Sequence, residues 1–502
     1  MGVSPYVRTV KTGSGATAVQ VVWSNRGGSK RMDHIGSAHT PEDVEILKAV
    51  ANQRMAEGQD ELDFGDGQPR KRALTIRGSR AEHLWDALSA GFRAVGLQWA
   101  AAGDEVFKHL VLARIIEPTS KLDSIRVLDE IGIAAASYPT INRRLPVYAK
   151  DYWRRRIAAG FAEHVGLGPA TLVLYDVTTL YFETDQGDGF RESGFSKERR
   201  LEPQITIGLL ADVRGFPLMV HAFEGNKAET TTMIPVLHQF MAAHRIPEVT
   251  IVADAGMLSD GNLKALSAAG LRYIVGQPIP KVFYQLEQWQ KTHPGQPPED
   301  QMILTQPWAR GSLEAQQSET IYYQYRADRA RRSLRGIDEQ VRKAADAVAG
   351  KTAVKRNRFV RLEGGSKSVN RELEAKTRTL AGWKAYITNL PNPTPEYVIG
   401  AYHQLWQIEK SFRMSKSDLR ARPIYHHKRD SIEAHLTIVF AALAVVRWLE
   451  ATTGVSIKQL VKTLRRYRTI DIQAGDQIVT AEDPLPDDVI ELLDRIHQHA
   501  PR

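Results

Sequence analysis

The sequence predicts an α/β protein in which a β-sheet core follows a mainly helical N-terminal region. Three observations predict this class. Five short apolar runs, each bounded by turn signals, follow one another after residue 170. Two stretches with helical spacing separate the last three of these runs, which gives the order β-β-β-α-β-α-β. A polar segment then interrupts the core, and strand and helix patterns resume after it.

The N-terminal region begins with strand-like sequence and continues with helical spacing. The apolar run 18–23, followed by a turn at 26–28, predicts a small β-hairpin. Thr40 precedes a proline and two acids, which is typical of a helix start capped by threonine. Helical periodicity then dominates 82–164. Residues 1–165 are therefore expected to form a mainly helical region.

The first part of the core is expected at 166–276. Its predicted strands are 171–176, 203–210, 216–223, 249–254 and 271–275, and its predicted helices are 231–244 and 259–269. The first and fourth strands each end in an aspartate. Helices that alternate with strands in this way are typical of an α/β sheet.

Residues 277–380 have a different character and are expected to form an insertion subdomain. The segment is polar, basic and punctuated by proline and glycine. Within it, 319–325 predicts one strand and 326–348 predicts one charged helix.

The core is expected to resume at 381–450 with the strand 383–388. Two long helices follow it, one over 395–416 and one over 431–450. A C-terminal segment, 451–502, completes the chain; it is basic at first and then rich in acids.

Composition restricts the classes of function. The chain has 502 residues, a net charge of +9 and no cysteine. Its pI near 9.4 favours a polyanionic partner. The absence of cysteine excludes disulfides, thiolate zinc sites and cysteine nucleophiles. No glycine-rich loop continues into the lysine and serine or threonine of a phosphate-binding loop, so no nucleotide cofactor is expected.

Nothing in the sequence predicts a membrane partner. The N-terminus lacks the apolar run of a signal peptide. The most apolar stretch, Leu436–Val446, is too short to span a bilayer and is flanked by charged residues, so it predicts a buried helix. The expected location is the cytoplasm, in association with the nucleoid.

Asp176 and Asp254 are the first candidate functional residues. Each ends an apolar run of the predicted sheet. Functional groups of α/β sheets gather at the carboxyl ends of strands, and two acids there would hold a hard divalent cation. A single aspartate after a strand is more often a turn or cap residue, so it is the pair that favours a site.

A third acid, Glu409, lies on the predicted helix 395–416. Tyr402, Glu409 and Lys416 are spaced seven residues apart, which returns a helix to within about 20° of the same azimuth. The three side chains would therefore share one face. The same spacing also fits a solvated face with no function.

These segments resemble the DDE transposases of bacterial insertion sequences, which have a ribonuclease H-like core. The stretch around Glu409 is similar to one branch with the signature Tyr, Arg, Glu and Lys, in which Leu405 stands at the arginine position. Further segments carry the resemblance, namely 172–183, 194–210, 250–263 and 412–427.

The resemblance implies cut-and-paste transposition by metal-dependent chemistry. Asp176, Asp254 and Glu409 would hold two Mg²⁺ ions, with Mn²⁺ as a substitute. The partners would be double-stranded DNA, both the terminal inverted repeats of the element and the target, bound by a homodimer on paired ends. The N-terminal region would be a DNA-binding region. In this branch a DNA hairpin frees the element.

The resemblance also implies phosphate contacts. It assigns them to Tyr402 and Lys416, and Arg413 or Arg422 would replace the charge that Leu405 lacks. Lys197 and Arg199, in the loop after the first core strand, would either track a DNA backbone or form a solvated basic loop. Trp383 would either stack on a flipped base or be a core tryptophan.

Three functions remain open at this point. The first is an active transposase, favoured by Tyr402, Lys416 and the large insertion. The second is a structure-specific nuclease on the same fold that hydrolyses DNA without strand transfer. The third is an inactive DNA-binding descendant, which the presence of all three acids disfavours.

Overall fold

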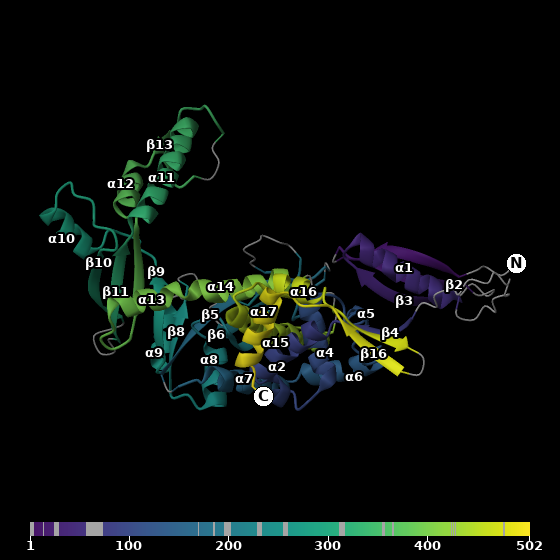
Figure 1. Cartoon of the computed structure of the whole chain (residues 1–502). Helices are drawn as coiled ribbons and strands as arrows, with labels where there is room; N and C mark the ends of the chain where they lie inside the picture. The colour runs from purple at the N-terminus through teal and green to yellow at the C-terminus, as the bar shows by residue number, and fades with distance from the viewer. Residues whose placement is uncertain are drawn as a thin grey trace, which may run out of the picture. The chain divides into compact units, whose positions relative to one another are not determined.

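The computed structural model (Figure 1) consists of two compact units, each described here by itself. One comprises Met1–Ala94, Ala101–Val147 and Trp448–Arg502, and the other comprises Val95–Ala100 and Tyr148–Arg447. The structure describes residues 5–13, 15–24, 30–56, 74–168, 170–183, 186–194, 202–227, 233–254, 260–310, 317–353, 357–363, 366–422, 424, 426, 428–474 and 477–501.

The first unit begins with a three-stranded antiparallel sheet in the order β1-β2-β3, formed by β1 (Tyr6–Lys11), β2 (Thr17–Ser24) and β3 (Lys30–Ala38). The predicted hairpin corresponds to β2 and β3, which pair antiparallel, and β1 is an additional strand that the sequence did not predict. Helix α1 (Pro41–Ala56) covers the sheet, where Ala51 packs against Val19 and Val21. The Thr40 hydroxyl accepts a hydrogen bond from the Asp43 amide, which confirms the predicted cap.

The predicted helical stretch is confirmed as a series of short helices. Those of the first unit are α2 (Glu82–Ala94), α4 (Glu105–Ile116), α5 (Asp123–Glu130) and α6 (Tyr138–Tyr148). The C-terminal segment adds α16 (Ile457–Leu464), β15 (Thr469–Ala474), β16 (Gln477–Glu482) and α17 (Asp487–His499). Strand β15 lies between β16 and β4 (Thr75–Arg80), so it joins segments that are about 390 residues apart.

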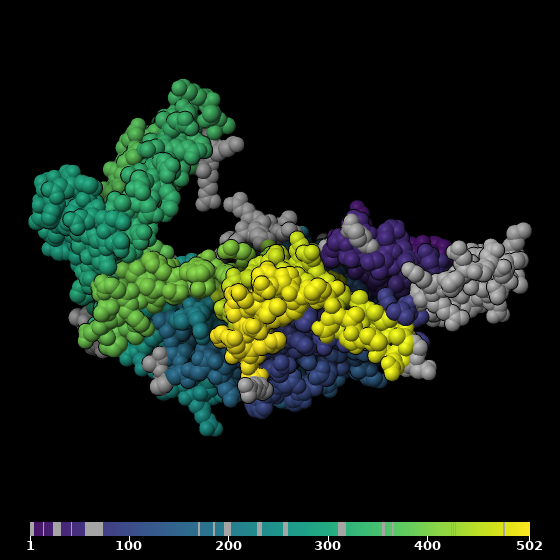
Figure 2. Space-filling model, viewed as in Figure 1, coloured from purple at the N-terminus to yellow at the C-terminus, as the bar shows by residue number. Residues whose placement is uncertain are grey.

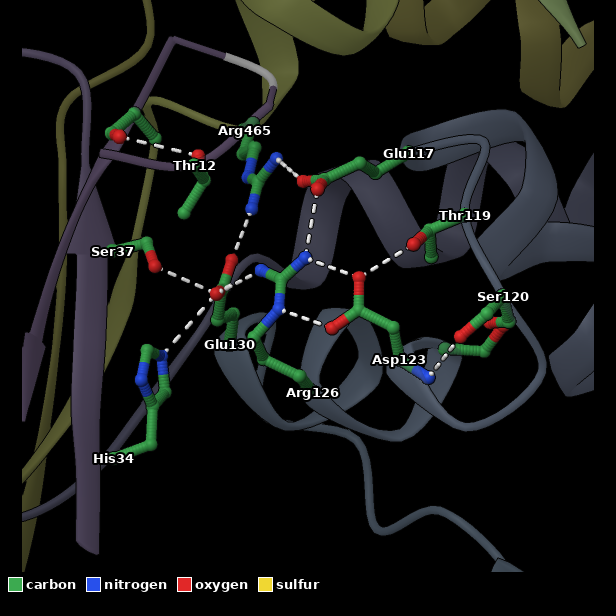
Figure 3. Close-up of polar contacts among 12 residues, drawn as sticks. Thr12, His34, Ser37, Glu117, Thr119, Ser120, Asp123, Arg126, Glu130 and Arg465 are labelled. Carbon is green, nitrogen blue, oxygen red and sulfur yellow. Dashed lines mark hydrogen bonds and ion pairs between the residues drawn. The ribbon is translucent and has the colours of Figure 1, made fainter. Parts of the chain in front are cut away.

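A buried ionic network lies at Glu130, whose side chain is only 2% exposed (Figure 3). The carboxylate accepts hydrogen bonds from Ser37 at 2.6 Å and from Arg465 at 2.5 Å, and it also pairs with Arg126 and His34. Burial alone would raise the pKa of Glu130, but these hydrogen bonds and charges lower it to about 2. The network therefore connects β3, α5 and the chain after α16 within this unit.

The second unit is built on an eight-stranded mixed sheet in the order β10-β11-β14-β9-β8-β5-β6-β7. Its first five strands along the chain are β5 (Ala170–Tyr181), β6 (Gln204–Ala211), β7 (Pro217–Glu224), β8 (Glu248–Ala253) and β9 (Arg272–Gln277). The β5-β6-β7 meander is antiparallel, whereas β5-β8 and β8-β9 pair in parallel. The predicted α/β class and the order β-β-β-α-β-α-β are confirmed.

Helices accompany this sheet. The two that connect its strands are α8 (Met233–His244) and α9 (Asp260–Ala268), and α3 (Leu97–Ala100) and α7 (Asp151–Val165) precede β5. Helix α15 (Arg429–Thr453) contains the apolar stretch predicted to be a buried helix. Among the described residues it is the one helix whose length and composition would suit a membrane span, and 94% of its most apolar window is buried. The buried-helix prediction is thus confirmed.

The segment expected to be an insertion contributes to the sheet as well as forming a lobe. Strands β10 (Ile303–Arg310), β11 (Gln317–Tyr325) and β14 (Trp383–Thr388) extend the sheet, with α10 (Tyr284–Thr292) beside them. The lobe, green in Figure 2, consists of α11 (Ala327–Val348), β12 (Val360–Glu363), β13 (Ser366–Val369) and α12 (Arg371–Thr379). Its small core includes Ile337, Val341 and Phe359.

The helix predicted over 395–416 is interrupted, and this corrects the sequence-based prediction. It consists of α13 (Pro395–His403), α14 (Leu405–Arg413) and the π-helix η3 (Met414–Asp418). Gln404 separates the first two, and the wider π turn changes the azimuth of the residues that follow. The seven-residue stripe therefore does not continue regularly from Glu409 to Lys416.

Candidate active site

Asp176 and Asp254 lie at equivalent positions on neighbouring parallel strands. Leu174 of β5 is paired with Val252 of β8, and each aspartate is two residues further along its own strand direction. Because side chains alternate along a strand, equal offsets place both carboxylates on the same face of the sheet. Asp254 directly follows β8, as predicted.

Asp176 differs from the prediction in one respect, because its strand does not end there. Strand β5 continues to Tyr181, and Asp176 is paired with Leu209 of the antiparallel neighbour β6. The β-branched residues Val177, Thr178 and Thr179 favour this continuation. Asp176 therefore lies where the parallel partner β8 has ended but the antiparallel partner continues.

Tyr402, on α13, forms a hydrogen bond to one of the two strand acids. It is 5% exposed, and its hydroxyl donates a hydrogen bond of 2.6 Å to Oδ1 of Asp254. Helix α13, which carries Tyr402, packs on β8, β9 and β14. Gly276 of β9 leaves room for the Tyr402 side chain. A Cβ at this position would lie 2.7 Å from the Tyr402 hydroxyl oxygen, which is too close for a side chain to fit without a shift. Burial raises the pKa of Tyr402, and the hydrogen bond to Asp254 raises it further.

Glu409 lies on α14, the helix that packs against β5, the strand of Asp176. Its side chain is exposed. The negative charges of Asp254 and Glu409 both raise the pKa of Tyr402, and both also raise the pKa of Lys384. The third acid is therefore electrostatically coupled to the same pair of side chains as Asp254.

Lys384, on β14, provides a cation beside this group. Its Nζ lies 4.3 Å from the centroid of the Tyr402 ring and 5.8 Å from that of Tyr386. Burial lowers the pKa of Lys384 and the charge of Arg329 lowers it further, whereas Asp254 and Glu409 oppose them. The site thus has a half-buried ammonium that packs on an aromatic face near two carboxylates.

The donor set is chemically suited to a hard divalent cation, because all three acids offer oxygen ligands. Two of them share one face of the sheet, and Tyr402 fixes one oxygen of Asp254. In the part of the chain that the structure describes, no three His, Cys, Asp or Glu side chains are gathered closely enough to hold a metal ion. Glu409 would therefore have to turn toward the strand acids to complete a three-carboxylate site.

Comparison with known families decides which family this arrangement belongs to. The family model described as "Transposase DDE domain" matches residues 167–445, more than half of the chain. The chain belongs to the DDE transposase family. No curated protein matches it.

Two solved transposase structures are similar to the chain at low identity. The cryo-EM structure of the piggyBac transposase synaptic complex with hairpin DNA is 11% identical, covers 90% of this chain and 81% of its own, and has a TM-score of 0.34. The Mos1 transposase paired-end complex with left transposon end is 16% identical, covers 46% of this chain and 66% of its own, and has a TM-score of 0.16.

The matched DDE transposase domain contains every candidate site residue. Among the basic ones, Arg413 is exposed at the end of α14 and Lys416 lies in the π-helix η3. The guanidinium carbon of Arg422 lies 5.4 Å from the centroid of the Tyr181 ring, at the end of β5. Leu405 is 9% exposed, so this transposase domain has a buried apolar side chain where the signature has arginine.

Trp383 lies in an aromatic cluster of the transposase domain. It is 7% exposed, and its ring centroid is 5.4 Å from those of Phe283 and Tyr325. This is the environment of a core tryptophan. Lys197 and Arg199 lie outside the described residues.

Three residues of this candidate site, Lys384, Arg329 and Gly276, were not predicted from the sequence. Lys384 gave no signal, because a lysine near the start of a strand is ordinary. Arg329 donates hydrogen bonds to the carbonyls of Gln324 and Gly382, and the importance of Gly276 depends on Tyr402 lying over it. The contacts of Arg329 with Gly382 and of Gly276 with Tyr402 join residues that are far apart in sequence, so no local pattern predicts them.

Proposed function

We propose that the chain is an active transposase that cleaves DNA at the ends of a mobile element and joins the freed 3′-hydroxyl ends to target DNA. One observation carries the proposal. A DDE transposase domain presents Asp176 and Asp254 in register on parallel strands, with Glu409 on a helix packed against one of those strands. The ribonuclease H-like description of the core is part of the proposal and is supported by the strand order.

Asp176, Asp254 and Glu409 would hold the divalent cations, with Mg²⁺ favoured by the all-oxygen donors. When bound, two such ions activate the attacking oxygen and neutralise charge on the phosphate. Tyr402 holds Asp254 in one orientation through its hydroxyl. That leaves the second carboxylate oxygen of Asp254 for a cation.

The remaining residues act on the DNA. Arg413, at the end of α14, and Lys416, in η3, would contact phosphates, and Arg422 would do so from the chain after η3. The match to the Tyr-Arg-Glu-Lys branch rests on Tyr402, Glu409 and Lys416. Because Leu405 is buried and uncharged, hairpin formation depends on another cation in place of the missing arginine.

The experiment uses the purified full-length chain, Mg²⁺ and duplex DNA tiled across the natural flanks of its coding sequence. We expect site-specific cleavage at element ends and joining of these ends to a plasmid target. Asp254→Asn and Glu409→Gln should abolish cleavage but leave DNA binding nearly unchanged. Glu248→Gln is the matched control, because Glu248 begins the same strand at its opposite end and pairs with Arg272 at 3.0 Å.

The products separate this proposal from a nuclease. Cleavage without joined products would establish hydrolysis only and reject strand transfer. Unimpaired cleavage by Asp254→Asn would show that the site is elsewhere. Sedimentation of the protein with end DNA tests the proposed homodimer on paired ends, which predicts two chains and two DNA ends in each complex.

A further inference from the structure

A basic groove of about 650 Å³ lies between the sheet and the lobe of the second unit. Residues of β9, α11, α12 and β14 line it. The lining contains Arg358, Lys376 and Lys384 but no aspartate or glutamate. Polar side chains such as Gln340 and Thr377 and apolar ones such as Ile337 and Leu373 also line it. A groove with three cations and no acid is suited to a polyanion.

Lys384 connects this groove to the candidate active site. It lines the groove, and its Nζ also lies 4.3 Å from the centroid of the Tyr402 ring, whose hydroxyl is bound to Asp254. An anion held at Lys384 would therefore lie one side chain away from the strand acids.

The ammonium of Lys384 is available for a ligand. Within the described residues it forms no ion pair with a carboxylate, and its Nζ faces the rings of Tyr402 and Tyr386. A cation that faces an aromatic ring keeps N–H donors for an oxygen on its open side. Partial burial strengthens such a contact, because the phosphate would meet a charge that water screens poorly.

We propose that Lys384 binds a phosphodiester of the DNA strand next to the cleaved bond, at the point where that strand enters the basic groove. This inference rests on the proposed function and adds a positioning residue to it. Leu405 provides no charge, whereas Lys384 places a cation 4.3 Å from the centroid of the Tyr402 ring. The alternative is a purely local role, in which Lys384 only offsets the charges of Asp254 and Glu409.

The test measures DNA binding without divalent ions, so that it does not depend on catalysis. The probe is the duplex of the flanking series that binds most tightly, prepared with a recessed 3′-hydroxyl end. Lys384→Met keeps the length of the side chain that covers Tyr402, and Lys384→Gln repeats the test with a polar side chain. Lys384→Arg retains the charge. Lys343→Met, at an exposed lysine of α11 paired with Glu339, is the control.

We expect Lys384→Met and Lys384→Gln to bind about tenfold more weakly and to lower the salt slope of binding by about one. Lys384→Arg and Lys343→Met should bind like the wild type. A neutral methylphosphonate placed at each position in turn should weaken wild-type binding at one position near the end, and that penalty should disappear in Lys384→Met.

An unchanged salt slope, or the same methylphosphonate penalties in wild type and Lys384→Met, would overturn the inference and leave the local role. These readouts are independent of cleavage. Thus the role of Lys384 can be rejected even if the chain cleaves DNA. Conversely, if the methylphosphonate penalty at one position disappears in Lys384→Met but no cleavage is seen, the proposed function is rejected instead.

Discussion

The hydroxyl of Tyr402 donates a hydrogen bond of 2.6 Å to Oδ1 of Asp254, which lies 148 residues earlier in the chain. The bond joins the buried face of α13 to the end of β8. It gives Tyr402 a role in the free protein, namely to orient a carboxylate, in addition to the phosphate contact that the sequence resemblance implies. The tyrosine ring also supports Lys384.

Tyr402→Phe removes this bond but keeps the ring. We expect cleavage to slow by about 10- to 100-fold, because Asp254 loses its fixed orientation, while the free energy of unfolding falls by only about 1 kcal/mol. Rates of single-turnover cleavage and chemical denaturation measure the two effects. Tyr397→Phe, at an exposed tyrosine of the same helix, is the control. Wild-type cleavage by Tyr402→Phe would show that the hydroxyl is dispensable.

Trp383→Ala tests whether this tryptophan is mainly a core residue. Loss of its contacts with Phe283 and Tyr325 should destabilise the protein by about 3 to 5 kcal/mol. The midpoint of chemical denaturation checks this. Exposed Trp406 on α14 provides the comparison, since Trp406→Ala should change the stability far less. If Trp383→Ala folds with wild-type stability and loses only hairpin formation, base stacking is its role.

Glu130→Gln tests the ionic network of the first unit. The change leaves the guanidinium groups of Arg126 and Arg465 beside a neutral amide, so we expect a loss of about 2 to 4 kcal/mol in the free energy of unfolding. Denaturation by urea at neutral pH measures it. Glu491→Gln, at a largely exposed acid 3.9 Å from Arg495, should cost less than about 1 kcal/mol. Equal effects of the two changes would contradict a special role for Glu130.

His221 predicts a pH dependence of stability in the second unit. Burial and the positive charge of Arg154 lower the pKa of its imidazole, and the negative charge of Asp151 raises it. The result is a pKa of about 4. The unfolded chain binds a proton near pH 6.5 and the folded chain does not until about pH 4. This contribution to stability is therefore present above pH 6.5 and lost as the pH falls toward 4.

His221→Gln should remove this loss. Between pH 7 and pH 4.5, the wild type should lose about 2 to 3 kcal/mol more stability than the variant. Chemical denaturation at stepped pH values provides the comparison, with His238→Gln, on the exposed side of α8, as the control. Parallel curves for wild type and His221→Gln would reject the assignment.

The sequence by itself determined the α/β class, the order of the core strands and the three candidate acids. Apolar runs and helical spacing are local properties, so β6 to β9 and their helices were predicted to within a few residues. The resemblance to DDE transposases is confirmed by the domain match at 167–445, whereas the branch suggested by the residues around Glu409 stays a prediction. Strand β1 and the extension of β5 beyond Asp176 were not predicted, because pairing with a neighbouring strand stabilises them.

Only the tertiary structure decided how the site is assembled. The register of β5 against β8 gives Asp176 and Asp254 equivalent positions, Gly276 makes room for Tyr402, and β14 brings Lys384 to the tyrosine ring. It also interrupted the predicted helix at Gln404 and in η3, which breaks the stripe expected to reach Lys416. The physical reason is that these relationships depend on strand pairing and close packing between residues of different helices and strands, whereas sequence periodicity records only which face of a single element is buried.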